Sequence, residues 1–257
     1  MSAFQTLIYE KKDAAAYVTL NRPEALNAYS IQMRDDLYEV MCAIRDDDEI
    51  RVAILKGAGE KAFCAGADLS EFLTAPPPVA ARQVRFDRDI WGLFLSIPQP
   101  LIAALHGYVL GSGIEIALCC DIRIASDKAR FALPEVGLGI IPAAGGSQTL
   151  PRTVRTGKAM ELLFTGQLID AGEACRIKLV NRVVPADQLL MTAKKMARKI
   201  ALLDPVAVQC AKQAVTRGVE LSLAEGLHLE KRLASRFYLK KIGNGKRDDQ
   251  EGIEGFL

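Results

Sequence analysis

The order of apolar and polar positions divides the chain into an α/β region and a helical region. Short apolar runs bounded by glycine, proline or charged residues predict strands at residues 4–10, 16–20, 52–55, 101–105, 122–125 and 129–132. Amphipathic spacing predicts helices at residues 31–46, with Ser30 as N-cap, and at 80–96, and a strongly apolar run predicts a helix at 113–120. We expect polar Lys11–Asp13 to join the first two strands as a hairpin, and Gly107–Gly113 to form a glycine-rich turn. Strand, small-residue loop and helix follow each other twice, which indicates stacked β–β–α turns in an α/β fold.

A change of pattern places a division near residue 190. Strand-like segments end at residues 180–185, and residues 186–240 have helical spacing with breaks at 203–205 and near Gly218. We therefore predict an α/β core at residues 1–190 and a helical region at 191–257. The helical region is too thin to enclose a core of its own. It is expected to pack on the core domain or on another subunit.

Composition and charge narrow the class of protein. The 257 residues are 50% hydrophobic and 25% charged, with a formal net charge of +2. This balance is ordinary for a globular protein and argues against a dedicated nucleic-acid or membrane-surface protein. No apolar run approaches membrane-spanning length, and the first residues lack the pattern of a targeting peptide.

The cysteines and histidines argue against a metal site. The six cysteines are scattered without a C-x-x-C spacing, and the two histidines, His106 and His228, are far apart in the sequence. Neither a disulfide framework nor a zinc site is expected. Free thiols in a reducing compartment are the better interpretation, so we expect a cytoplasmic protein.

Two small-residue turns carry the first chemical signal. Ala67 lies in Phe63–Leu69 and Ser112 lies in Gly107–Glu115, and each turn leads into a helix. A helix N-terminus has unpaired N–H groups and a partial positive charge. Two such N–H groups that converge on one oxygen would form an oxyanion hole. Each turn alone is better explained by close packing, but the two together, with a carboxylate three residues after Ser112, favour function.

Two glutamates carry the second signal. Glu115 lies about one helical turn from Ser112, among apolar residues, and Glu135 lies between a proline and a glycine-rich loop. A carboxylate in apolar surroundings is costly unless it has a role, and two in one pocket would form a general acid/base pair. The alternative is that Glu115 interacts with the helix dipole and that Glu135 is a surface charge.

These residues resemble the enoyl-CoA hydratase/isomerase, or crotonase, superfamily over nearly the whole chain. The matching motifs, in order, are Leu20-Asn21-Arg22-Pro23 with Leu26-Asn27-Ala28, Phe63–Leu69, Gly107–Glu115, and Pro134-Glu135 with Gly139–Pro142 and Gly145-Gly146. The resemblance implies a spiral of repeated ββα turns and a C-terminal helical region that helps to form homotrimers, often paired as hexamers. It also implies acyl-CoA thioester substrates, with coenzyme A as part of the substrate and neither a separate cofactor nor a metal.

The resemblance implies a role for each site residue. The N–H groups of Ala67 and Ser112 would form the oxyanion hole, Glu115 would activate water and Glu135 would protonate the α-carbon. Substrate or CoA contacts would come from Arg22, Ala25, Lys61, Ala65, Ala67, Asp68, Leu69, Gly111 and Ser112. For Arg22 and Lys61 taken alone, solvated surface charge is the alternative.

Some positions depart from the family pattern. Ser112 stands where glycine or alanine is common, and Ala143 stands where hydratases often have a glycine next to the catalytic water. Leu133 replaces a polar residue of some hydratases. The first change keeps the N–H group that the site needs, whereas Ala143 could alter the shape of the pocket.

The sequence as a whole predicts an enoyl-CoA hydratase, with other functions left open. Within the family the alternatives are enoyl-CoA isomerisation, a specialised dehydration or thioester hydrolysis. A non-catalytic or RNA-binding member is the alternative from another class, which two intact carboxylates and a balanced charge argue against. The acyl pocket is expected near residues 72–96, where Phe86, Trp91 and Phe94 are wall residues or core residues.

Overall fold

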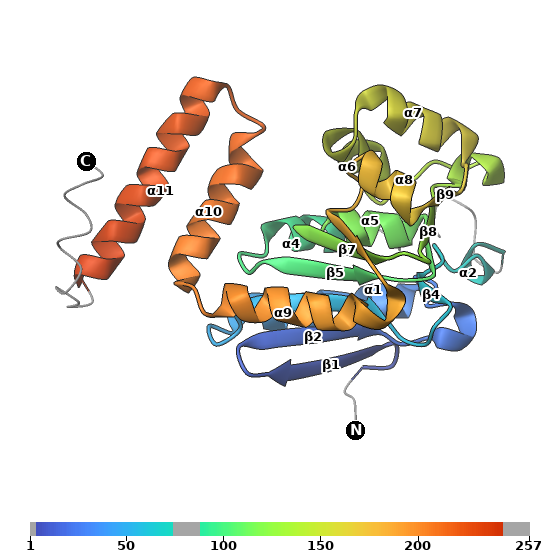
Figure 1. Ribbon diagram of the computed structural model, residues 1–257, viewed down its shortest axis with the longest axis horizontal. Coiled ribbons are helices and arrows are strands. Elements are labelled where there is room, and N and C mark those ends of the chain that lie inside the picture. The colour runs from blue at the N-terminus through green and yellow to red at the C-terminus, as the bar shows by residue number, and fades with distance from the viewer. Residues whose placement is uncertain (1–3, 74–87, 244–257) are drawn as a thin grey trace. The chain divides into compact units, whose positions relative to one another are not determined.

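The protein divides into two compact units, Met1–Leu202 and Leu203–Leu257. The computed structural model describes residues 4–73 and 88–243 (Figure 1). Within these residues the first unit holds the strands, and the second unit is helical. The division lies beyond the expected boundary near residue 190, because helix α9 (Leu189–Ala201) packs on the strands of the first unit.

Two sheets make up the α/β unit. The larger has the strand order β1-β2-β3-β5-β7-β10, and every neighbouring pair is parallel except β1 and β2. Its strands are β1 (Leu7–Lys12), β2 (Ala15–Leu20), β3 (Val52–Gly57), β5 (Leu101–Leu105), β7 (Ile122–Ser126) and β10 (Arg182–Val184). The smaller sheet contains β4 (Ala62–Cys64), β6 (Tyr108–Leu110), β8 (Arg130–Ala132) and β9 (Ile169–Asp170) in that order.

The chain passes between the two sheets in a repeating manner. Strands β3, β5 and β7 of the large sheet are each followed closely by a strand of the small sheet, β4, β6 and β8. A helical segment follows each pair: α2 (Ser70–Leu73), α5 (Ser112–Leu118), and η2 (Glu135–Leu138) with α6 (Gly146–Thr153). The predicted α/β fold of repeated ββα turns is confirmed. The third repeat, around β7 and β8, adds to the two that the sequence indicated.

Most predicted helices form where expected. Helix α1 (Ile31–Asp46) begins after Ser30, whose hydroxyl accepts a hydrogen bond from the Met33 N–H at 3.1 Å. Helix α4 (Ile90–Ser96) is capped by Asp89, and the expected start of that helix at residue 80 lies outside the described residues. The remaining elements are η1 (Pro23–Ala25), α7 (Thr156–Thr165), α8 (Ala171–Arg176) and η3 (Ala186–Gln188).

Three short features differ from the sequence expectation. The hairpin turn lies at residues 13–14 and not at Lys11–Asp13, because Asp13 takes a left-handed conformation (φ 55°) that closes a tight turn. The expected turn at residues 107–113 contains β6, and the expected loop at 63–69 begins within β4. Strands of three residues are too short to show an alternating pattern.

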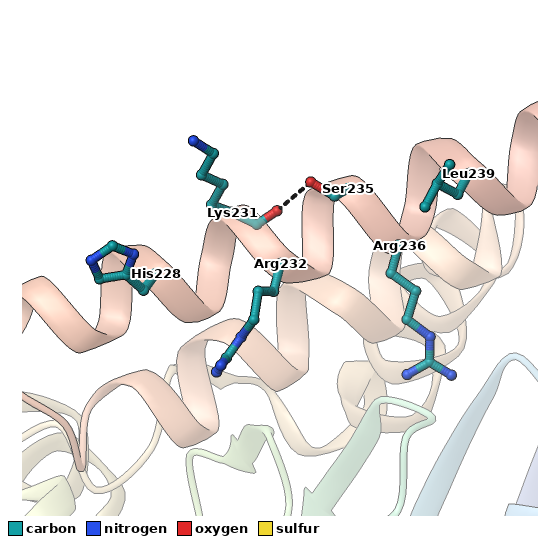
Figure 2. Close-up of a pocket in the computed structure, with 6 residues that line it drawn as sticks. All are labelled: His228, Lys231, Arg232, Ser235, Arg236 and Leu239. Atoms are coloured by element: carbon teal, nitrogen blue, oxygen red, sulfur yellow. Dashed lines mark hydrogen bonds between the residues drawn. The ribbon is translucent and has the colours of Figure 1, made fainter.

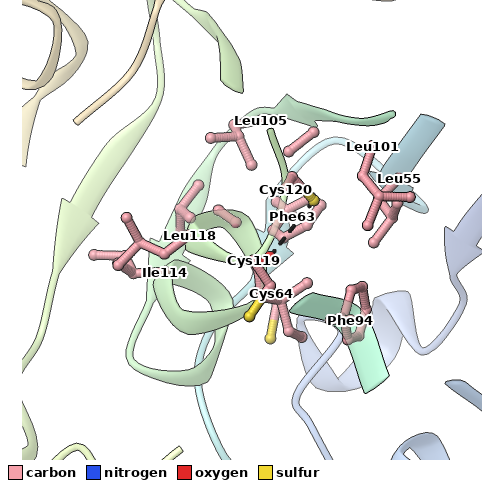
Figure 3. Close-up of a cluster of buried hydrophobic side chains, with 14 of the residues drawn as sticks. Leu55, Phe63, Cys64, Phe94, Leu101, Leu105, Ile114, Leu118, Cys119 and Cys120 are labelled. Atoms are coloured by element: carbon pink, nitrogen blue, oxygen red, sulfur yellow. Dashed lines mark hydrogen bonds between the residues drawn. The ribbon is translucent and has the colours of Figure 1, made fainter. Parts of the chain in front are cut away.

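Both faces of the large sheet are buried at its central strands. In β3, Ala53 and Leu55 face one apolar cluster, while Val52 and Ile54 face a second cluster that α9 covers. This two-sided burial explains the continuous apolar runs of the parallel strands. Figure 3 shows part of the first cluster, where side chains from α5 and the residues after it lie near those of β4 and β5. Cys64, Cys119 and Cys120 are members of this cluster, as expected for cysteines acting as small apolar residues.

The described part of the second unit, residues 203–243, contains two helices. Helix α10 (Pro205–Gly218) begins after Asp204, whose carboxylate accepts from the Ala207 N–H at 3.0 Å, and α11 spans Leu223–Gly243. Helix α10 has no buried residue, and the buried residues of α11 within the described part are Leu229 and Leu233. Several apolar side chains of this part are uncovered, and Val215, Val219 and Leu223 are 65%, 74% and 80% exposed.

Candidate active site

The backbone around Ala67 is fixed by pairing with Tyr29. The Tyr29 N–H donates to the Gly66 carbonyl at 2.8 Å, and the Asp68 N–H donates to the Tyr29 carbonyl at 2.8 Å. In this parallel pairing Tyr29 bonds to the residues on either side of Ala67, so Ala67 directs its own N–H away from Tyr29. Among the described residues, no hydrogen bond uses the Ala67 N–H. This amide is thus an available donor.

The second turn places Ser112 at the start of α5. Gly111 precedes the helix with φ 48°, a left-handed conformation that favours glycine, and its N–H donates to the Ala132 carbonyl at 2.9 Å. Ser112 is the first helical residue, so its N–H has no carbonyl partner within the helix. Ser112 and Ala67 therefore both carry amide N–H groups that can donate to a ligand oxygen.

Glycines bring the two turns together. A Cβ added at Gly113 would lie 2.2 Å from the Cys64 carbonyl oxygen, which shows how closely α5 approaches the end of β4. A Cβ at Gly111 would lie 3.5 Å from the Gly66 Cα. The turn that holds Ala67 and the turn that holds Ser112 are therefore direct neighbours, and at Gly113 the close approach leaves no room for a side chain.

Glu115 is buried and anchored by backbone amides. Its side chain is 2% exposed, and its Oε1 accepts from the N–H groups of Ala144 and Gly146 at 3.0 and 2.9 Å. Burial raises the pKa of Glu115 to about 7, against the lowering effect of the Gly146 amide, and the neighbouring charge of Glu135 raises it further. A carboxyl that titrates near neutrality can accept or release a proton under physiological conditions.

Glu135 opens η2 and lies against the second turn. A Cβ added at Gly111 would lie 2.6 Å from Glu135 Oε1, so this carboxyl contacts the residue before Ser112. Its Oε2 is buried without a hydrogen-bond partner among the described residues. Burial raises the pKa of Glu135 above its ordinary value. The fold therefore places both glutamates beside the Ser112 turn.

The candidate CoA-binding residues differ in their surroundings. Arg22 forms an ion pair with Asp68, with Nη2 and Oδ2 2.8 Å apart. Lys61 and Leu69 are exposed, while Ala25 and Ala65 are half-buried. Of these, Arg22, Ala65, Asp68 and Leu69 lie in or against the loop that carries Ala67.

Two residues that hold Glu115 carry no sequence signal of that role. Ala144 and Gly146 act through backbone N–H groups, which are the same in every residue except proline. The pair Gly145-Gly146 was the available hint, since Gly145 has φ 97° and helix α6 follows it. Ala143, expected beside the catalytic water, is exposed next to these amides, and Leu133 is buried in the core.

Other candidate groups are structural. Burial raises the pKa of the Cys64 thiol to about 12, which argues against a nucleophile. Phe94 is fully buried in the core, and Trp91 packs against Tyr29 with ring centroids 5.7 Å apart. Phe86 lies outside the described residues. His106 is half-buried at the end of β5, and burial lowers its pKa.

A hollow on α11 contains none of these site residues. Figure 2 shows its lining side chains, which all come from this helix: His228, Lys231, Arg232, Ser235, Arg236 and Leu239. Across the described residues, no group of three or more His, Cys, Asp or Glu side chains is arranged to hold a metal ion. Within residues 4–73 and 88–243, no helix is both long enough and apolar enough to span a membrane.

Comparisons with known proteins agree with the fold and the motifs. A profile of the enoyl-CoA hydratase/isomerase family matches residues 10–257. The short-chain-enoyl-CoA hydratase of Clostridium acetobutylicum is 45% identical over 224 residues, which cover 87% of this chain and 86% of that protein. The crotonyl-CoA hydratase of Syntrophomonas wolfei is 38% identical over 256 residues, which cover 99% of this chain and 96% of that protein.

A solved structure of an enoyl-CoA hydratase has a similar fold. The crystal structure of an enoyl-CoA hydratase from Bacillus anthracis matches with a TM-score of 0.88 and 39% sequence identity. The match covers 98% of this chain and 96% of that one. From its sequence, its repeated ββα turns and these similarities, the chain belongs to the enoyl-CoA hydratase/isomerase, or crotonase, family.

Proposed function

We propose that the protein is an enoyl-CoA hydratase that adds water reversibly to a 2-enoyl-CoA thioester. The observation that carries this proposal is the Glu115 carboxyl, buried with a pKa near 7 beside Glu135 and the Ser112 turn. Hydratases from Clostridium acetobutylicum and Syntrophomonas wolfei resemble the chain over most of its length. An acid/base pair beside two available amides suits a reaction that passes through an enolate.

In the proposed mechanism, the amides polarise the substrate. The thioester carbonyl oxygen accepts hydrogen bonds from the N–H groups of Ala67 and Ser112. Negative charge develops on this oxygen when water attacks the β-carbon, and donors that are fixed before the reaction stabilise that charge. The free N–H of Ala67 and the dipole at the start of α5 support this role.

The glutamates then move the protons. The Ala144 and Gly146 amides hold Glu115 Oε1, and the Ser112 hydroxyl also interacts with the carboxyl. The carboxylate accepts a proton from water as the water oxygen bonds to the β-carbon. Glu135 gives a proton to the α-carbon, and the enolate returns to a thioester. The net change is addition of H and OH across the double bond, and dehydration follows the same path in reverse.

Substitution of each glutamate tests the proposal. We expect wild-type protein to hydrate crotonyl-CoA, followed by loss of the 2-enoyl thioester absorbance. Glu115→Ala and Glu135→Ala should each lower kcat by about a hundredfold or more, since each removes a proton-transfer group. Wild-type rates in both variants would refute the assignment, and turnover of a 3-enoyl-CoA without hydration would favour an isomerase.

We also propose that the substrate is held through its CoA portion and that the enzyme works as a homotrimer or a hexamer. Ala25, Lys61, Ala65 and Leu69 remain the proposed contacts to CoA, whereas the guanidinium of Arg22 is engaged by Asp68. The uncovered apolar surface of α10 and α11 supports self-association. Free thiols at all six cysteines support a cytoplasmic location.

A further inference from the structure

A strained turn lies beside the loop that carries Ala67. Leu26 and Asn27 both have left-handed backbones, with φ 53° and 55°. Such conformations persist in residues other than glycine only when surrounding contacts hold them, and they concentrate at functional sites. Here the buried Asn27 side chain donates to the carbonyls of Ala58 and Ala62 at 2.9 and 2.8 Å and accepts from the Arg22 N–H at 2.9 Å.

Hydrogen bonds join this turn to both sides of Ala67. The Ala65 N–H donates to the Leu26 carbonyl at 3.1 Å. On the other side of Leu26, Tyr29 pairs with Gly66 and Asp68 through the two bonds described above. The peptides that flank Ala67 are therefore fixed, and the direction of its N–H depends on the position of residues 26–29.

Arg22 closes the connection through its side chain. Its Nη1 donates to the Ala28 carbonyl at 2.8 Å, and its Nη2 lies 2.8 Å from Asp68 Oδ2. The other Asp68 oxygen accepts from the N–H and hydroxyl of Ser70. Both side chains of the ion pair are largely buried, at 23% and 14% exposed. The guanidinium thus bridges the strained turn and the residue that follows Ala67.

We infer that Arg22 and Asp68 are positioning residues that hold the Ala67 N–H in line for the substrate carbonyl. The inference rests on the proposed function, because it assigns a purpose to the direction of that amide. If the ion pair is removed, residues 65–68 keep their backbone hydrogen bonds to the turn but lose the side-chain attachment, and the Ala67 amide can shift out of line. The loss weakens stabilisation of the transition state and leaves the binding of CoA largely unchanged.

A comparison of two substrates separates this role from a contact to a CoA phosphate. The variants are Arg22→Gln, Asp68→Asn and the double variant, assayed with crotonyl-CoA and with crotonyl-pantetheine, which lacks the phosphates. We expect kcat to fall about 10- to 100-fold with both substrates, while KM changes by only a few fold. The double variant should lose no more kcat than the more impaired of the two single variants, because both substitutions remove the same ion pair.

Controls keep the result interpretable. Arg176→Gln breaks the pair that Arg176 forms with Glu173 on α8, far from this loop in sequence, and should leave kcat unchanged. Thermal unfolding checks that each variant is folded. If Arg22→Gln does not fold, Arg22→Lys replaces it. Lysine keeps the charge but cannot reach both Ala28 and Asp68 in the same way, so kcat should still fall, but by less than in Asp68→Asn.

A probe that needs no turnover distinguishes failure of this inference from failure of the hydratase assignment. The absorption of 4-dimethylaminocinnamoyl-CoA moves to longer wavelength when its carbonyl is polarised. Wild-type protein should produce this shift, and both single variants should reduce it. A rise in KM for crotonyl-CoA alone with unchanged kcat and an unchanged shift would overturn the inference. Absence of hydration by wild type with the shift intact would overturn only the hydratase assignment.

Discussion

At the scale of single residues, the site depends on the environment of Glu115. Its carboxyl is buried and its anchors are two uncharged amides, so ionisation is costly. The residue types at the site could be predicted from sequence, because two glutamates and two small-residue turns are visible there. The anchors at Ala144 and Gly146 could not, because a backbone N–H leaves no trace in residue identity.

The raised pKa of Glu115 predicts a pH-dependent stability. The folded pKa of about 7 exceeds the ordinary value of 4.5, so the folded state keeps a proton that the unfolded state releases, and stability falls as the pH rises through this window. Glu115→Gln removes this ionisation. At pH 8 it should be more stable than wild type by up to about 3 kcal/mol. Near pH 5 the gain in stability over wild type should be small.

Urea unfolding of both proteins at pH 5 and pH 8 checks this prediction. The variant should also have lost hydration activity, so that stability and activity change in opposite directions. An equal difference in unfolding free energy at the two pH values would mean that Glu115 does not titrate in the folded state. Wild-type hydration should rise as the pH passes through about 7, since ionised Glu115 accepts the proton of water.

Gly146 gives a second prediction at this scale. A Cβ there would lie 2.8 Å from Glu115 Oε1 and 3.0 Å from the Pro142 Cβ, so Gly146→Ala should displace the Glu115 carboxyl. We expect kcat to fall about 10- to 100-fold in a folded protein. Gly157→Ala on α7 is the matched control, because nothing lies within 4 Å of its added Cβ. Equal kcat values in the two variants would contradict the proposed role of this anchor.

At the scale of elements, the approach of α5 to β4 assembles the site. Helix α1 could be predicted because its apolar periodicity extends over 16 residues, and β3 could be predicted because residues 52–55 form a continuous apolar run. Strands β4 and β6 could not, because each has three residues inside a segment rich in glycine or alanine that is typical of a loop or turn. The left-handed turn at Leu26 and Asn27 was also hidden, since neither residue is a glycine.

Gly113 tests the contact between these two elements. An added Cβ would lie 2.2 Å from the Cys64 carbonyl oxygen, which is backbone and cannot turn aside. Gly113→Ala should therefore push α5 from β4, with a cost of about 2 kcal/mol or more in unfolding free energy and loss of hydration activity. Chemical denaturation with a parallel crotonyl-CoA assay measures both. Retention of wild-type stability and activity would show that the two turns tolerate separation.

At the scale of the whole molecule, the sequence indicated a core and a helical region, and the two compact units divide at residues 202–203. The position of the division was missed because α9 has the amphipathic pattern of an outer helix in either region. Its buried residues Leu189, Ala193 and Ala197 contact the large sheet. Which surface an amphipathic helix covers is a tertiary property, so periodicity alone does not determine it.

The uncovered helices of the second unit predict self-association. Val215 and Val219 are 65% and 74% exposed in or just after α10, an unusual exposure for neighbouring apolar side chains. Light scattering after size exclusion should give the mass of a trimer or a hexamer for wild type. Val215→Asp with Val219→Asp should reduce this mass, because charges would become buried at the contact. A monomeric wild type would contradict the proposal.

The most direct test of the central claim follows the atoms of water into the product. Crotonyl-CoA is incubated with the enzyme in ¹⁸O-labelled D₂O, and the product is analysed by mass spectrometry and NMR. The account predicts 3-hydroxybutyryl-CoA with the label oxygen on the β-carbon and one deuterium on the α-carbon, and no such product with Glu115→Ala. A shifted double bond or a free carboxylic acid carrying the label would contradict it.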